Sequence, residues 1–175
     1  MSELIEFLQA NSEDRGVRAA LRCALRPSQE MRAWPYLAAF GGIGAGHDAE
    51  VARTVAGIFA TCYSSDFPAL DSIGQVCRAL CSTDEDPTKY ESDTTEKASQ
   101  PGPMARRFAY LLNADKKEIC VRVARLMVYA KSQGVGVDYE KLEQDLRTWP
   151  RARTAWARDF WGQAPREEGI EGEEK

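Results

Sequence analysis

Arginine side chains at helical spacing are the residues of this sequence best suited to contact a charged ligand. Four of them recur at intervals of three, four and four residues, namely Arg15, Arg18, Arg22 and Arg26. At 100° per residue they share a stripe about 80° wide on one helix. A guanidinium group stays charged and makes two parallel hydrogen bonds to a phosphate. The stripe is about 16 Å long at 1.5 Å per residue, so it is able to follow several phosphates of a nucleic acid.

A second, weaker set of basic residues lies in the C-terminal half. Arg122, Arg125 and Tyr129 repeat at helical spacing, with Arg106, Arg107 and Lys131 as candidate extensions. An exposed Tyr129 ring would be able to stack on a base. The alternative for both sets is a solvated helix face, paired with acidic groups of neighbouring elements or of a protein partner.

If the first set of arginines binds phosphate, the fold should not depend on these side chains. None of the four arginines has a carboxylate three or four residues further along its helix to pair with. We therefore expect that Arg18, Arg22 and Arg26 can be replaced together by Ala without loss of the fold, because Ala is the better helix former.

No set of residues typical of an enzyme is present. His47 is the only histidine, it lies in a glycine-rich segment, and we interpret it as an exposed loop residue. The sequence contains no HExxH, GxSxG or P-loop motif. Five cysteines with one histidine do not make a zinc set. All but Cys62 fall on or near apolar helix arcs, and we interpret them as reduced, buried residues. We predict a protein with no enzymatic activity, no metal site and no cofactor.

The elements that would position the basic residues are helices. Apolar spacing predicts an all-α fold of about eight helices, without strands. The central helix is expected between the N-cap Asp115 and the C′ residue Gly134. One of its apolar arcs contains Ile119, Cys120, Val123, Leu126, Met127 and Ala130, and a second contains Val121, Ala124 and Val128. A helix with two apolar arcs is expected to be packed on more than one side.

Three further helix starts and one further helix are expected from local signals. Ser12, Asp48 and Asp138 are candidate N-caps, and apolar spacing predicts a helix over residues 70–81.

Charge and composition divide the chain into four segments. We expect an N-terminal helical group (1–82), a flexible acidic linker (83–102), a C-terminal helical group (103–161) and a disordered acidic tail (162–175). Their net charges are −2, −4, +5 and −3, so the overall charge of −4 conceals a basic C-terminal group. The chain has no apolar stretch of about 18 residues, and its N-terminus is acidic where a signal peptide is basic. We expect a cytoplasmic protein that does not contact membranes.

Three segments resemble the CasB family, the small subunit of the type I-E CRISPR surveillance complex Cascade. They are RGVRAALRCALRP (15–27), the stretch from RRFAYLL to DLRTW (106–149), and WARDFWG (156–162). The resemblance implies a non-catalytic, all-helical protein present in two copies, which braces the backbone and large subunits of the complex. It also implies contact with guide RNA and target DNA, chiefly the displaced strand. The alternative is a helical scaffold module that binds only proteins.

Overall fold

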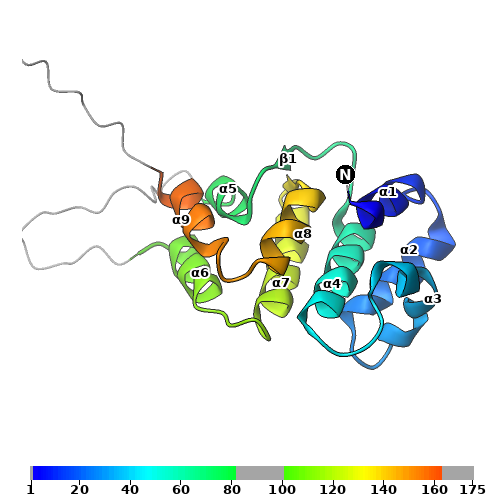
Figure 1. Cartoon of the computed structure of the whole chain (residues 1–175). Helices are drawn as coiled ribbons and strands as arrows, with labels where there is room; N and C mark the ends of the chain where they lie inside the picture. The colour runs from blue at the N-terminus through cyan, green and yellow to red at the C-terminus, as the bar shows by residue number, and fades with distance from the viewer. Residues whose placement is uncertain (1, 82–100, 163–175) are drawn as a thin grey trace, which may run out of the picture.

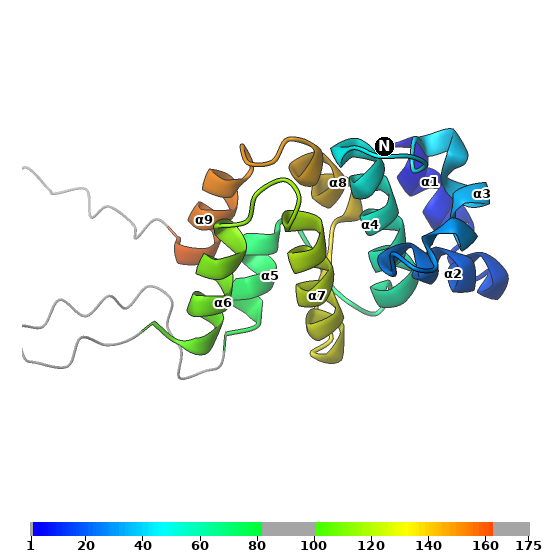
Figure 2. The same cartoon turned by 90° about the horizontal axis from the view of Figure 1, so that it is seen from below.

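The chain forms a row of helices, which the computed structural model describes for residues 2–81 and 101–162 (Figures 1 and 2). In chain order, the elements in these two ranges are α1 (Glu3–Ala10), α2 (Arg15–Arg22), η1 (Cys23–Leu25), η2 (Glu30–Arg32), α3 (Trp34–Leu37), η3 (Ala38–Phe40), α4 (His47–Cys62), β1 (Ala69–Leu70), α5 (Ile73–Ala79), α6 (Pro103–Leu112), α7 (Ile119–Ser132), β2 (Gly136–Val137), α8 (Tyr139–Arg147) and α9 (Arg153–Trp161). The first helices and α5, α6 and α9 form the two ends, with α4, α7 and α8 between them. The expected all-α class is confirmed.

Helix α4 lies at the centre of the packing. Most of its sixteen residues are buried, and it packs against α1, α2, α7 and α8. A glycine lets η1 also lie close against α4, because a Cβ at Gly57 would lie 2.5 Å from Cγ of Leu25. The prediction that the helix after Asp115 is the central one was therefore wrong.

Helix α7 is buried on one side only. The first apolar arc packs inward as expected, but Val121 and Val128 of the second arc are 47% and 48% exposed. The Asp115 carboxylate accepts hydrogen bonds from the N–H groups of Lys117 and Glu118, but these belong to the turn before the helix. The N-cap residue of α7 is Glu118, so the expectation of Asp115 as the N-cap was wrong by three residues. Gly134 has the positive φ of 71° that suits a C′ residue.

Helix α2 and helix α4 begin at other residues than the sequence signals indicated. Asp14, and not Ser12, caps α2 by accepting from the N–H groups of Gly16 and Val17. Gly46, and not Asp48, is the N-cap residue of α4. At α8 the expected cap is confirmed, since Asp138 accepts from the N–H groups of Glu140 and Lys141.

A two-stranded parallel sheet corrects the expectation of a chain without strands. Ala69 pairs with Gly136 and Leu70 with Val137. Two residues are too short to show the alternation by which a strand is recognised in a sequence. Helix α5 consequently begins at Ile73 and not at residue 70, with the Ser72 hydroxyl accepting from the N–H group of Gln75.

Helices that precede residues 82–100 in the chain pack against helices that follow them. Helix α5 precedes this segment but packs against α9 and α6, which follow it. Ser72 donates a hydrogen bond of 2.5 Å to the Asp159 carboxylate, and Gly74 lies directly against the backbone of Trp156. The expected linker, except for Pro101 and Gly102, and the expected tail, except for Gly162, lie outside the described residues.

His47 connects three parts of the fold. It is the first residue of α4, with Nε2 2.6 Å from the Leu146 carbonyl of α8 and Nδ1 3.1 Å from the Lys116 carbonyl before α7. The interpretation of His47 as an exposed loop residue was therefore wrong. The N-cap expected at Asp48 placed the start of α4 two residues too late, and no local pattern indicated the two carbonyl partners of His47.

Candidate nucleic-acid interface

The N-terminal arginine stripe is shorter than its spacing indicates. Helix α2 ends at Arg22, and the chain continues as a 3-10 turn through Leu25. Arg26 then has extended backbone angles, φ −120° and ψ 108°, so it leaves the helix axis. Arg15, Arg18 and Arg22 remain on α2, and the prediction of a four-residue stripe on one helix was wrong.

Three of the predicted phosphate-binding residues cap the C-terminus of α4. Arg18 donates to the Ala60 carbonyl from Nε (3.4 Å) and Nη2 (3.3 Å), and Arg22 donates to the same carbonyl from Nε (3.0 Å). Lys131 donates from Nζ to the Thr61 carbonyl at 2.6 Å. The last carbonyls of a helix lack helical partners and carry partial negative charge, so cations stabilise this end.

These contacts change what the arginines of α2 are able to do. Arg18 also donates from Nη1 to the Ser12 carbonyl at 3.3 Å, so all its nitrogens are engaged within the protein. The expected tolerance of the fold to Ala at Arg18 and Arg22 therefore does not follow from the structure. Arg22 is exposed and uses only Nε, which leaves both Nη groups able to bind a phosphate.

Helices α6 and α7 meet along a line of alternating arginine and tyrosine side chains, which we call the α6–α7 seam. It consists of Arg107 and Tyr110 from α6 with Arg122 and Tyr129 from α7. The guanidinium carbon of Arg107 lies 5.2 Å from the centre of the Tyr129 ring, and that of Arg122 lies 3.7 Å from the centre of the Tyr110 ring. Both are cation–π contacts between the two helices.

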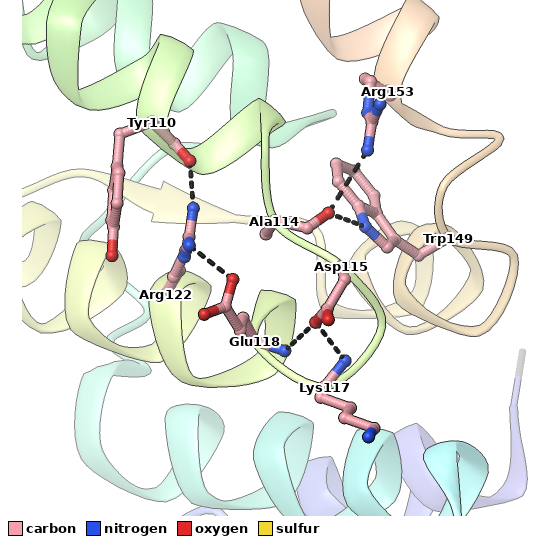
Figure 3. Close-up of polar contacts among 8 residues, drawn as sticks. All are labelled: Tyr110, Ala114, Asp115, Lys117, Glu118, Arg122, Trp149 and Arg153. Atoms are coloured by element: carbon pink, nitrogen blue, oxygen red, sulfur yellow. Dashed lines mark hydrogen bonds and ion pairs between the residues drawn. The ribbon is translucent and has the colours of Figure 1, made fainter.

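Arg122 is the fixed member of the seam (Figure 3). Its Nη2 lies 2.5 Å from the Glu118 carboxylate, and its Nη1 donates to the backbone carbonyl of Tyr110. The Arg122 side chain is only 13% exposed. This guanidinium group therefore organises the seam and is not available to a phosphate.

The exposed cations around the seam are Arg106 and Arg107 on α6 and Arg125 on α7. Arg125 is three residues after Arg122 and four before Tyr129, so it lies beside both on the helix surface. Lys131 is not an extension of this group, because its Nζ reaches Thr61 at the end of α4. The structure thus divides the predicted residues into separate groups. Arg18, Arg22 and Lys131 form an α4-capping cluster, and Arg106, Arg107, Arg122 and Arg125 lie in or around the α6–α7 seam. Arg15 and Arg26 are exposed outside both groups.

Tyr110 was missed in the sequence, although it is 59% exposed. Its spacing of three residues from Arg107 places it on the same side of α6. That signal was present, but it points to a site only when α7 is known to pack alongside.

A groove of about 580 Å³ lies on another side of α7. Its apolar walls include Leu25, Val121, Ala124 and Val128, and Arg125 lies at its edge. Arg125 is therefore shared between this groove and the surroundings of the seam.

The cysteine thiols, which are nucleophiles or metal ligands in many proteins, are largely buried in this fold. Burial raises the pKa of the thiols of Cys62 to about 11 and of Cys77 and Cys120 to about 12.

In residues 2–81 and 101–162, no three His, Cys, Asp or Glu side chains gather closely enough to hold a metal ion. No helix in the same two ranges is both long and apolar enough to cross a membrane.

Comparisons with known proteins agree on one family. Residues 17–161 match the family model of the CRISPR-associated protein Cse2. The structure is similar to the crystal structure of CasB from Thermus thermophilus, with a TM-score of 0.63 and 24% identity, covering 93% of this chain and 100% of that one. It is also similar to a second crystal structure from Thermus thermophilus, that of a CRISPR-associated protein of the Cse2 family, with a TM-score of 0.61 and the same identity and coverage. No curated protein gave a significant match. Because the family model matches most of its length, the chain belongs to the CRISPR-associated Cse2 family, the CasB family of type I-E Cascade.

Proposed function

We propose that this chain is a non-catalytic small subunit of Cascade that braces the complex and holds nucleic acid on the basic surroundings of the α6–α7 seam. Its partners would be the backbone and large subunits, a second copy of itself, the guide RNA and the target DNA, chiefly the displaced strand. The observation that carries the proposal is the grouping of three exposed arginines, Arg106, Arg107 and Arg125, with two exposed tyrosines at the contact of α6 and α7.

A non-catalytic role is supported by the use of the only histidine. Both ring nitrogens of His47 face backbone carbonyls of the fold. Neither nitrogen is left to exchange a proton with a substrate, which is the usual task of a catalytic histidine.

A helical scaffold module that binds only proteins is the second candidate, and the apolar groove beside α7 favours it. Val121 and Val128 of α7 are about half exposed, and both line this groove. Exposed apolar surface of this kind is typical of protein contacts. The two functions are compatible if the seam holds nucleic acid and the groove holds a subunit.

Salt dependence of binding separates the candidates. A variant with Arg106→Gln, Arg107→Gln and Arg125→Gln should bind fluorescent duplex DNA more weakly, and its log–log salt slope should be flatter by up to ~2.7. For a single strand the expected change is up to ~2.1. The matched control carries Arg32→Gln, Arg78→Gln and Arg158→Gln, which removes the same charge from exposed positions outside the seam.

The control variant is expected to keep most of the wild-type slope. Equal losses in both variants would mean that binding reflects overall charge and not the seam. A seam variant that binds DNA normally but does not join the other Cascade subunits would establish the protein-binding alternative.

A further inference from the structure

We propose that Tyr110 and Tyr129 form a stacking platform for unpaired bases, so that the α6–α7 seam binds single-stranded nucleic acid through its bases as well as its phosphates. This inference rests on the proposed function, because it names the substrate class of the same site. It adds one residue, Tyr110, and one mode of contact that basic charge alone does not provide.

The Tyr110 ring lies against a cation and is still accessible to solvent. The guanidinium group of Arg122 lies 3.7 Å from the ring centre, yet Tyr110 is 59% exposed. Figure 3 shows Arg122 beside the ring, and the exposure of the residue leaves much of the ring accessible to a ligand. A flat, open aromatic face beside cationic groups is the arrangement on which bases stack without regard to sequence.

The ring is held in place before any ligand arrives. The Asp115 carboxylate fixes the first turn before α7 through the N–H groups of Lys117 and Glu118. The Glu118 carboxylate then holds Arg122, and Arg122 contacts both the ring and the backbone carbonyl of Tyr110 (Figure 3). A ring that is already ordered loses little conformational entropy on binding a base, which favours affinity.

The second ring lies further along the α6–α7 seam. Tyr129 is seven residues after Arg122 on α7, which corresponds to about 10 Å along the helix axis. That is about three steps of 3.4 Å for a stacked strand, and fewer for an extended one. Arg107 contacts the Tyr129 ring, and Tyr129 is 39% exposed. Both rings therefore combine a cation on one side with an accessible surface.

The arginines supply the remaining contacts. Arg122 is engaged within the protein, so the phosphates between two stacked bases would be met by exposed Arg107 and Arg125. A duplex has its base faces already stacked and cannot use the rings. The seam is therefore expected to prefer a displaced or otherwise unpaired strand over a duplex of the same length.

The test compares three ligands for the full-length protein: a thymidine strand of 20 nucleotides, an abasic strand of equal length and a duplex. Wild-type protein should bind the thymidine strand more tightly than the other two. The Tyr110→Ala variant should lose about 5- to 30-fold in affinity for the thymidine strand and less than two-fold for the abasic strand. The Tyr110→Phe variant should stay within two-fold of wild type, because stacking needs the ring and not the hydroxyl group. A uridine strand in parallel distinguishes RNA from DNA as the preferred ligand.

Met31→Ala is the matched control, since Met31 is a similarly exposed large side chain, at 65%, outside the seam. Equal wild-type affinity for the thymidine and abasic strands would overturn the stacking platform but leave the proposed function standing. Equal losses of Tyr110→Ala on both strands would also overturn it. If wild-type protein bound none of the three ligands at low salt, the proposed function would fall together with this inference. If Tyr110→Ala bound strands normally but did not assemble with Cascade subunits, the rings would belong to a protein interface.

Discussion

The Ala60 carbonyl accepts hydrogen bonds from Arg18 and Arg22 of α2. Substitutions at these arginines therefore affect the stability of the fold as well as any binding of nucleic acid. The Arg18 side chain places three nitrogens on backbone carbonyls, whereas the Arg15 side chain, one turn earlier, makes no hydrogen bond to any residue that the structure describes. The two side chains are of the same type and lie on the same helix. A loss of nucleic-acid binding at Arg18 is interpretable only together with a measurement of stability.

Replacing Arg18 by Ala should lower the free energy of unfolding by about 1–2 kcal/mol, because a buried carbonyl loses charged donors. The melting temperature should fall by about 2–4 °C for each kcal/mol in a chain of this size. Thermal unfolding followed by circular dichroism measures both. The matched control, Arg15→Ala, should stay within about 0.5 kcal/mol of wild type. Equal stability of the two variants would show that the hydrogen bonds to Ala60 and Ser12 contribute nothing.

Residue types and spacing in the sequence identified the basic residues but not their partners. Asp138 was predicted correctly as a cap, because a cap acts on backbone N–H groups two or three residues away. Arg18 and Lys131 contact carbonyls 42 and 70 residues distant, and no local pattern carries that information. The same reason explains why His47 was misinterpreted, since its partners Lys116 and Leu146 belong to the other half of the chain.

At the scale of elements, α5 and α9 pack against each other at very close range. A Cβ at Gly74 would lie 2.1 Å from the Trp156 carbonyl oxygen and 2.9 Å from Cβ of Asp159. The obstructing atoms belong to the backbone and to the base of a side chain, so neither is able to move aside alone. The two helices would have to separate, although Ser72 and Asp159 are joined by a hydrogen bond at the same place.

Gly74→Ala should therefore lower the free energy of unfolding by about 1–3 kcal/mol, the usual cost of overpacking a close contact. Chemical denaturation with urea measures this change. Gly16→Ala in α2 is the control, because the nearest atom there is the Asp14 carboxylate oxygen at 3.2 Å. That oxygen caps α2 and has to shift by only a few tenths of an ångström, and Ala has the higher helix propensity, so the loss should be clearly smaller than for Gly74→Ala. A Gly74→Ala variant as stable as wild type would mean that α9 does not pack on α5 as closely as the structure indicates.

The sequence predicted most helices but not the order in which they pack. Amphipathic spacing is a local property, so α7 was recognised together with its buried arc. The exposure of Val121 and Val128 was not recognised, because an apolar arc does not reveal whether a neighbour covers it. The central position of α4 also depends on approaches such as that of Gly57 to Leu25, which join residues far apart in the sequence.

At the scale of the whole molecule, acidic and basic residues are segregated along the chain. The exposed arginines near the α6–α7 seam lie in the segment 103–161, with a net charge of +5, while residues 162–175 carry −3. The match to the Cse2 family model ends at residue 161. The acidic tail therefore adds charge opposite to that of the proposed nucleic-acid interface, from outside the part of the chain that matches the family.

Ending the chain after Gly162 should raise its affinity for non-specific DNA at low salt. The truncation removes five glutamates, Arg166 and Lys175, which changes the net charge of the chain from −4 to −1. Repulsion between the tail and the phosphates acts over about 10 Å at 0.1 M salt and only about 3 Å at 1 M, so the gain should fade as salt rises. Fluorescence anisotropy with a duplex of arbitrary sequence, at salt concentrations from about 50 to 500 mM, measures the gain. The control keeps the tail at full length with its five glutamates changed to Gln, and it should bind at least as tightly as the truncated chain, because the effect depends on charge and not on length. A gain that persists at high salt, or one that the Gln tail does not reproduce, would mean that the tail limits binding through something other than its charge.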